Sequence, residues 1–185
     1  MKNVLLFTTV ILFALTSVSA QVKLGFGLGY ASPTGDAKDF LDGGISGHAE
    51  LGYGVTEDLD VSLLYQGDFL VGAELDGAGV GNLTLSSFMA NTRYFFTKSG
   101  FRPYGSLGFG LTNVGAVELE GSGLSIEVLE STSNFSFRPA LGFKYGVLNV
   151  NAAYLSAGKI GEGAAEQSIG DFTFNIGLLF TIGGA

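Results

Sequence analysis

The feature of this sequence that most constrains its fold is a period-two alternation of bulky apolar residues with small or polar ones. It is clearest in DFTFNIGLLFTI (171–182), where every second residue from Phe172 to Ile182 is apolar and large. Successive side chains of a β-strand point to opposite faces, so this stretch predicts a strand with one apolar face. The same alternation recurs from VKLGFGLGY (22–30) onward and predicts eight strands, while no segment shows convincing helical periodicity.

The predicted connections between these strands alternate between long and short. We place long loops at 31–44, 67–82, 112–134 and 156–170, and short turns at 54–58, 97–101 and 146–147. This arrangement is typical of an all-β, eight-stranded antiparallel up-and-down transmembrane β-barrel, with long loops outside, tight turns in the periplasm and strands of about 10 residues. The third loop also alternates weakly, and we expect its hairpin to continue beyond the membrane to a turn at 121–123.

The volume and charge of the two strand faces decide which one points outward. An eight-stranded barrel is only wide enough inside for side chains to fill it, and the apolar face carries too many Phe and Tyr residues to fit. The opposite face is rich in Gly, Ser and Asn, which do fit. The apolar face also lacks Lys, Arg, Asp and Glu, and a basic residue at the bilayer midplane would cost about 2–4 kcal/mol. A soluble barrel would show the reverse pattern.

Aromatic residues of the apolar face gather at the strand ends, which predicts two girdles at the membrane interfaces. The girdle at the long-loop ends consists of Tyr30, Tyr65, Phe135, Tyr154 and Phe172, and the girdle at the short-turn ends consists of Tyr53, Tyr94, Phe96, Tyr145 and Phe180.

The N-terminus predicts export. Residues 1–3 carry a positive charge, an apolar run from Val4 to Leu15 is too short to span a bilayer, and Val18-Ser19-Ala20 forms a small-residue cleavage site. We therefore predict a signal peptide at 1–20 and one barrel domain at 21–185. Without Lys2 the chain has 8 basic and 17 acidic residues, a net charge of −9, which argues against a nucleic-acid partner.

Several of these patterns resemble the small outer-membrane β-barrel proteins of the opacity-like, OmpW-like and OmpA-transmembrane-like group. The similar segments are LGFGLGY, NTRYFFTKSGFRPYGSLGFGLT and the closing FTFNIGLLFTI, although the chain runs on through Gly183, Gly184 and Ala185 where many relatives stop at an aromatic residue. The resemblance implies an integral protein of the outer membrane of a Gram-negative-type bacterium, inserted by the barrel-assembly machinery and in contact with outer-membrane lipid and lipopolysaccharide. We expect a monomer.

Charged residues on the inward face predict a paired network in the lumen, because an unpaired ion in so narrow a space is heavily penalised. The residues assigned to the lumen charge network are Lys23, His48, Glu50, Asp60, Arg93, Arg138, Lys144 and Asp171. They either plug the lumen, which is our preferred interpretation, or line a polar pathway. His48, two residues before Glu50 on the same face, is expected to be a hydrogen-bonded lumen residue rather than a catalytic or metal-binding one.

Two further expectations concern single features. Pro139 lies in the middle of a predicted strand, where we expect a bulge or a water molecule to replace the lost backbone donor. Twelve carboxylates, Asp68 among them, are assigned to the long loops against only Lys38 and Lys159, which predicts an acidic outer rim of about −10, with oxygen ligands of the kind that divalent cations prefer.

The sequence predicts a non-enzymatic, porin-like barrel with a structural or surface-interaction role and a largely plugged lumen. The alternative, by resemblance to OmpW-like members, is a narrow channel or carrier for small molecules, including hydrophobic ones. An enzyme is disfavoured because no inward nucleophile, base and orienting acid occur together. We predict no catalytic residue, cofactor or metal.

Overall fold

Eight long strands form the wall of a barrel in the computed structural model, which describes residues 21–72, 74–75, 78–79, 82–119, 126–128, 132–160 and 167–183. The long strands are β1 (Gln21–Gly35), β2 (Leu41–Gly54), β3 (Leu59–Gly72), β6 (Asn82–Phe95), β7 (Phe101–Leu119), β9 (Thr132–Tyr145), β10 (Leu148–Ile160) and β11 (Gln167–Ile182). The short elements are a 3₁₀ helix, η1 (Asp36–Asp39), and the strands β4 (Glu74–Leu75), β5 (Ala78–Gly79) and β8 (Ile126–Val128). No helix among the described residues is long and apolar enough to cross a membrane.

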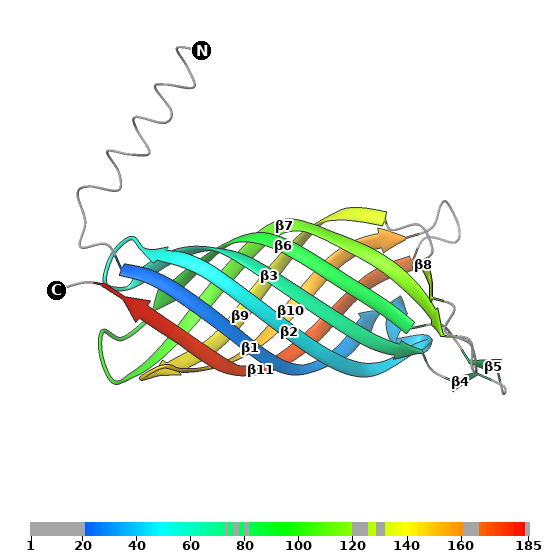
Figure 1. Cartoon of the computed structure of the whole chain (residues 1–185), viewed down its shortest axis with the longest axis horizontal. Helices are drawn as coiled ribbons and strands as arrows, with labels where there is room; N and C mark the ends of the chain where they lie inside the picture. The colour runs from blue at the N-terminus through cyan, green and yellow to red at the C-terminus, as the bar shows by residue number, and fades with distance from the viewer. Residues whose placement is uncertain are drawn as a thin grey trace, which may run out of the picture.

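Antiparallel pairing runs around the whole barrel and leaves no free edge among the long strands (Figure 1). The order is β6-β3-β2-β1-β11-β10-β9-β7, and a continuous ladder between β6 and β7 closes the ring. Closure satisfies the backbone N–H and C=O groups without water, which is the condition for strands to cross a bilayer. The predicted eight-stranded up-and-down barrel is therefore confirmed.

The two ends of the barrel differ. At one end β1 begins, β11 ends and the short connections 55–58, 96–100 and 146–147 lie, while β4, β5 and β8 mark the other end (Figure 1). Gly146 has a φ of 59° in the two-residue turn between the paired residues Tyr145 and Leu148, a conformation that tight hairpins need and glycine adopts without strain. β8 pairs with the end of β7, as expected for an extended third hairpin, whereas its predicted turn at 121–123 lies outside the described residues.

Side-chain burial confirms the predicted orientation of the two faces. Leu28, Leu63 and Leu141 on the outer wall are 70–73% exposed, and the charged residues assigned to the inward face are buried except for Lys144. The apolar wall of the barrel therefore faces outward, where in a membrane it would contact acyl chains.

The strands continue further at the long-loop end than predicted, and there the alternation reverses. In β6, Leu83 and Leu85 are buried inside the barrel while Thr84 and Ser86 lie on the outer wall, whereas Phe88, closer to the short turns, points outward. Polar residues outside and apolar residues inside are typical of a wall that faces water. The reversal thus marks where the lipid-facing band ends, and the predicted loop limits were wrong because strand pairing continues beyond it.

Pro139 does not produce the expected bulge. The register of β9 with β7 is continuous through Leu107–Pro139, and on the β10 side the pairs Ala153–Ala140 and Ser156–Phe137 keep the same register. The two intervening residues of β10 lack a ladder pair on β9, so the proline interrupts hydrogen bonding between these two strands without shifting them.

The outward face of β3 offers a direct test of the lipid-facing band. Leu63→Arg should lower the free energy of unfolding in phospholipid vesicles by about 2–4 kcal/mol, because the guanidinium would face hydrocarbon. Urea unfolding followed by circular dichroism measures the change, with Leu63→Ala as the matched control. An Arg variant as stable as the Ala variant would mean that this position meets water.

Candidate functional site

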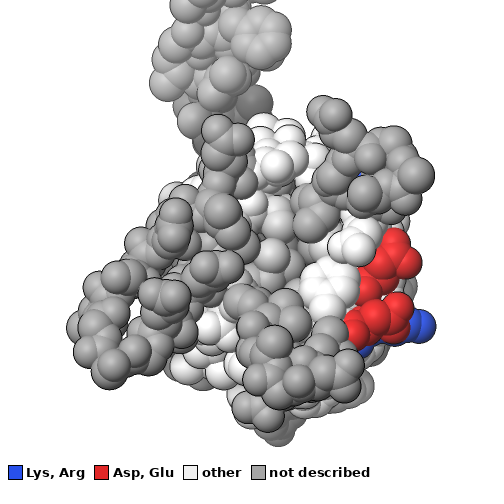
Figure 2. All heavy atoms as spheres, turned by 90° about the vertical axis from the view of Figure 1, so that its right-hand side faces the viewer, with Lys and Arg blue, Asp and Glu red and all other residues white. Residues whose placement is uncertain are grey.

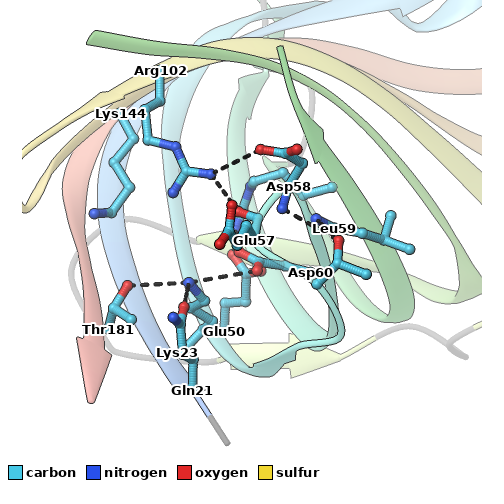
Figure 3. A network of polar contacts seen from close by, with 12 residues as sticks. Gln21, Lys23, Glu50, Glu57, Asp58, Leu59, Asp60, Arg102, Lys144 and Thr181 are labelled. Atoms are coloured by element: carbon cyan, nitrogen blue, oxygen red, sulfur yellow. Dashed lines mark hydrogen bonds and ion pairs between the residues drawn. The ribbon is translucent and has the colours of Figure 1, made fainter. Parts of the chain in front are cut away.

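The half of the lumen near the short turns holds a balanced layer of four charges. Lys23 of β1, Glu50 of β2, Asp60 of β3 and Arg93 of β6 are each at most 4% exposed. An Arg93 Nη atom lies 2.6 Å from a Glu50 oxygen and the other 3.9 Å from an Asp60 oxygen, while Lys23 Nζ lies 3.5 Å from Asp60. Two cations thus face two carboxylates from four neighbouring strands, as Figure 3 shows for Lys23, Glu50 and Asp60.

Apolar and polar groups enclose this layer. The Arg93 guanidinium lies 4.8 Å from the centre of the Tyr104 ring, a cation–π distance. The Tyr104 hydroxyl donates a hydrogen bond of 2.8 Å to Asn149 across the lumen. A Cβ on Gly142 would lie 2.7 Å from the Tyr104 hydroxyl, so only glycine leaves room for that ring.

Lys144 does not join the buried network. Its ammonium group donates to the carbonyl of Gly146 at the short-turn end of the barrel. Arg102 lies near the same end, where it donates to the carbonyl of Glu57 at 2.6 Å and pairs with Asp58 at 3.8 Å (Figure 3). Its guanidinium also lies 4.0 Å from the centre of the Phe95 ring. Sequence reasoning missed Arg102, although it lies two residues before Tyr104 and alternation therefore places it on the same inward face.

A second polar layer lies further along the lumen around Arg138 of β9. Arg138 Nε donates to Gln66 at 2.5 Å, one of its Nη atoms donates to Asn151 at 3.3 Å, and Gln66 donates to Asp68 at 2.7 Å. Asp68 and Asp171 are 1% and 0% exposed. The assignment of Asp68 to an outer loop was therefore wrong, because β3 continues to Gly72 and keeps this side chain inside.

His48 lies on the inward face of β2 between the two layers. It is buried, and its Nδ1 atom has no hydrogen-bond partner among the described residues. A Cβ on Gly27 would lie 2.6 Å from the imidazole, so glycine at this position of β1 accommodates the ring. The described residues contain no group of three or more His, Cys, Asp or Glu side chains that could hold a metal ion.

An apolar layer fills the lumen at the long-loop end. Buried side chains from η1 and from seven of the long strands form one cluster, which reaches from this end to Leu64, the ladder partner of Glu50: Ala31, Ala37, Leu41, Leu64, Leu70, Leu83, Leu85, Met89, Val114, Leu155, Ala157 and Ile169. Sequence reasoning had assigned most of the outer members to loops. The cavity left between the charged layers, lined by His48, Arg93, Tyr104 and Arg138 among others, has a volume of only about 10 Å³. That is at the lower limit of what one water molecule needs.

The predicted girdle residues all lie on the outer wall. Tyr53 and Phe180 are half-buried and the other eight are exposed. Tyr65 and Phe88 form a pair across β3 and β6 with ring centres 4.8 Å apart. Their action at the membrane interface stays a prediction.

At the long-loop end, η1 is fastened to the start of β11. The backbone N–H and the hydroxyl of Ser168 donate to the Asp36 carboxylate at 2.8 and 2.9 Å, and these bonds hold the pKa of Asp36 below its ordinary value. Asp39 and Asp42 nearby are exposed. Figure 2 looks onto this end and shows acidic side chains gathered at one edge.

A closed eight-stranded barrel with an apolar outer band and a packed interior defines a small transmembrane β-barrel. The chain matches the outer membrane protein beta-barrel domain family over residues 4–180. It belongs to this family of bacterial outer-membrane proteins.

Solved structures with the same fold include Neisserial surface protein A, at 18% identity and a TM-score of 0.66, covering 89% of this chain and 100% of that one. OprG from Pseudomonas aeruginosa is 13% identical with a TM-score of 0.54, covering 90% and 97%. Ail, the attachment invasion locus protein of Yersinia pestis, solved with the heparin analogue sucrose octasulfate, is 16% identical with a TM-score of 0.51, covering 88% and 100%. At these identities the likeness shows the shared fold. No curated protein matches this chain.

The buried charged layer should contribute strongly to stability. Arg93→Met should lower the free energy of unfolding by about 3–5 kcal/mol, because Glu50 and Asp60 would stay buried without their shared cation. The matched control is Lys98→Met, since the Lys98–Glu57 pair at 3.0 Å is more than 70% exposed on both sides and should contribute about 0–1 kcal/mol. Urea unfolding in vesicles measures the free energy of unfolding of both variants. Equal decreases in Arg93→Met and Lys98→Met would contradict a dry interior.

Proposed function

We propose that this protein is a non-conducting, non-enzymatic outer-membrane barrel that acts through its outer end rather than through its lumen. The observation that carries the proposal is the filled interior: two polar layers and one apolar layer leave about 10 Å³ between the charged groups. A hollow of about 760 Å³ is lined mainly by outward residues such as Leu107, Phe109 and Leu141, so it lies on the outer wall and not in the lumen. A narrow channel or carrier, the second candidate, would require these layers to separate.

The outer end supports a role in surface interaction. Asp36, Asp39 and Asp42 present carboxylates there, and Lys38 is the one basic residue of η1. Ail was solved with a polyanionic heparin analogue, whereas an acidic rim would repel such a ligand. We infer that the partners of this rim are cations, or the phosphates of lipopolysaccharide bridged by Mg²⁺ or Ca²⁺.

The remaining parts of the proposal follow from the family and the N-terminal sequence. Residues 1–20 act as a cleaved signal peptide, and the barrel-assembly machinery inserts the mature chain as a monomer. The girdle aromatics then lie at the two interfaces of the outer membrane, in contact with its lipids. The absence of catalysis is part of the proposal, because the fold by itself is compatible with enzymes.

Single-channel recording in planar bilayers tests the closed lumen. The full-length mature protein should show no steady conductance, because the polar layers block water and ions. A variant that removes one bulky side chain from each layer, Leu70→Gly with Arg93→Gly and Arg138→Gly, should conduct if it folds. Steady conductance of the unaltered protein would exclude the plug and favour the channel.

Unfolding in vesicles that contain lipopolysaccharide tests the acidic rim. Addition of Mg²⁺ should raise the unfolding midpoint of the unaltered protein, and the triple variant Asp36→Asn, Asp39→Asn, Asp42→Asn should lose most of that increase. Lys98→Met, at the opposite end, is the control and should keep it. An equal Mg²⁺ effect in all three proteins would remove these carboxylates from the proposal.

A further inference from the structure

The buried charges of the lumen do not balance. Among the described residues, three cations (Lys23, Arg93, Arg138) and four carboxyl groups (Glu50, Asp60, Asp68, Asp171) are buried. Lys23 and Arg93 pair with Glu50 and Asp60 in the layer near the short turns. Arg138 alone faces the other two carboxyls, so the second layer carries a formal excess of one negative charge, 1 − 2 = −1, when both are ionised.

Asp171 is the group that this imbalance leaves without a partner. Its side chain is fully buried, and neither carboxyl oxygen receives a hydrogen bond from the described residues. The residues opposite it on the neighbouring strands, Pro33 of β1 and Leu155 of β10, have no polar side chain to offer. The two donors that Arg138 directs at neighbours go to Gln66 and Asn151.

Another carboxyl group lies beside Asp171. Asp68 and Asp171 lie within hydrogen-bonding reach of each other. Gln66 donates to one Asp68 oxygen and the Ser46 hydroxyl lies opposite Asp68 on β2, whereas both Asp171 oxygens are left without a donor among the described residues. Two ionised carboxylates contain no donor between them, and like charges this close in a dry site do not both ionise.

A bound cation or a bound proton could supply the missing positive charge. Ca²⁺ and Mg²⁺ need six or more oxygen ligands at about 2.0–2.6 Å, and the described residues contain no suitable cluster of acidic, His or Cys side chains. A proton needs no volume and makes one carboxyl the donor that the other lacks. We propose that Asp68 and Asp171 hold a single proton between them, which makes this layer neutral together with Arg138.

The groups around the pair are few. β3 contributes Gln66, β9 contributes Arg138, β10 contributes Asn151, β2 contributes Ser46 and His48, and the inward residues of β1 at this level are not ionisable. Arg138 is the one permanently charged cation among these groups, and His48 is the one other basic side chain. The folded protein holds a proton that the unfolded chain releases at neutral pH, so unfolding becomes easier as pH rises, by about tenfold in the equilibrium constant per pH unit for one proton.

Infrared spectroscopy of the full mature protein in vesicles detects the proton directly. At neutral pH the unaltered protein should show the C=O stretching band of a buried protonated carboxylic acid. Asp171→Asn and Asp68→Asn should each abolish the band, because an amide supplies the missing donor and the remaining carboxyl can ionise. Asp36→Asn, outside the lumen, should keep it. Absence of the band from the unaltered protein overturns the proposal, and so does its persistence in both lumen variants.

Urea unfolding between about pH 6 and about pH 9 gives a second readout. The equilibrium constant for unfolding should depend more steeply on pH in the unaltered protein than in Asp171→Asn. The difference should be an additional factor of about ten for each unit by which the pH rises. Equal pH dependence would overturn the shared proton. If the free energy of unfolding depends on the concentration of Na⁺, Mg²⁺ or Ca²⁺ and not on pH, the two carboxylates bind a metal cation and the shared proton is overturned. If a variant fails to fold, the unaltered protein alone tests the proposal. Its protonated-carboxyl band should be present at neutral pH and lost at high pH, and absence of the band at neutral pH overturns the proposal.

Discussion

Closure of the strand ladder between β6 and β7 is the constraint on which the rest of the structure depends. Inside a bilayer an unpaired strand edge has no water to bind, so the sheet must return on itself. Closing eight strands gives a lumen only as wide as the side chains that fill it. Because the lumen is so narrow, glycine is needed at positions 27 and 142, where the side chains of His48 and Tyr104 approach the backbone. The same narrowness requires the buried charges to pair.

The lumen changes character along its length because the surroundings of the wall change. Next to the lipid band the wall is apolar outside, and polar groups are placed inside, where they pair with one another across strands. Beyond that band the wall meets water, and the side chains exchange roles, with Leu83 and Leu85 inside and Thr84 and Ser86 outside. The outer end therefore closes with an apolar core of the kind found in soluble proteins.

This change of character also explains what could be predicted from the sequence. Within the lipid band the contrast between the two faces is strong, so the sequence alone assigns six charged residues to the inward face: Lys23, Glu50, Asp60, Arg93, Arg138 and Asp171. In Phe69-Leu70-Val71 both faces are apolar, and in Leu83-Thr84-Leu85 the contrast is inverted. Asp68 follows a glycine at that boundary, so the sequence resembled a loop there. Which charges pair depends on strand register and tilt, which alternation does not encode.

The position of Asp68 and Asp171 at the boundary between polar and apolar layers makes their environment dry from both sides. Leu70 follows Asp68 on the same face of β3, and Leu155 lies opposite Asp171, so the apolar cluster covers the pair toward the outside. On the other side Arg138 is occupied by Gln66 and Asn151, and the cavity beyond holds at most one water molecule. Neither solvent nor a second cation can neutralise the extra carboxylate, which leaves protonation as the means by which this layer is buried without a net charge.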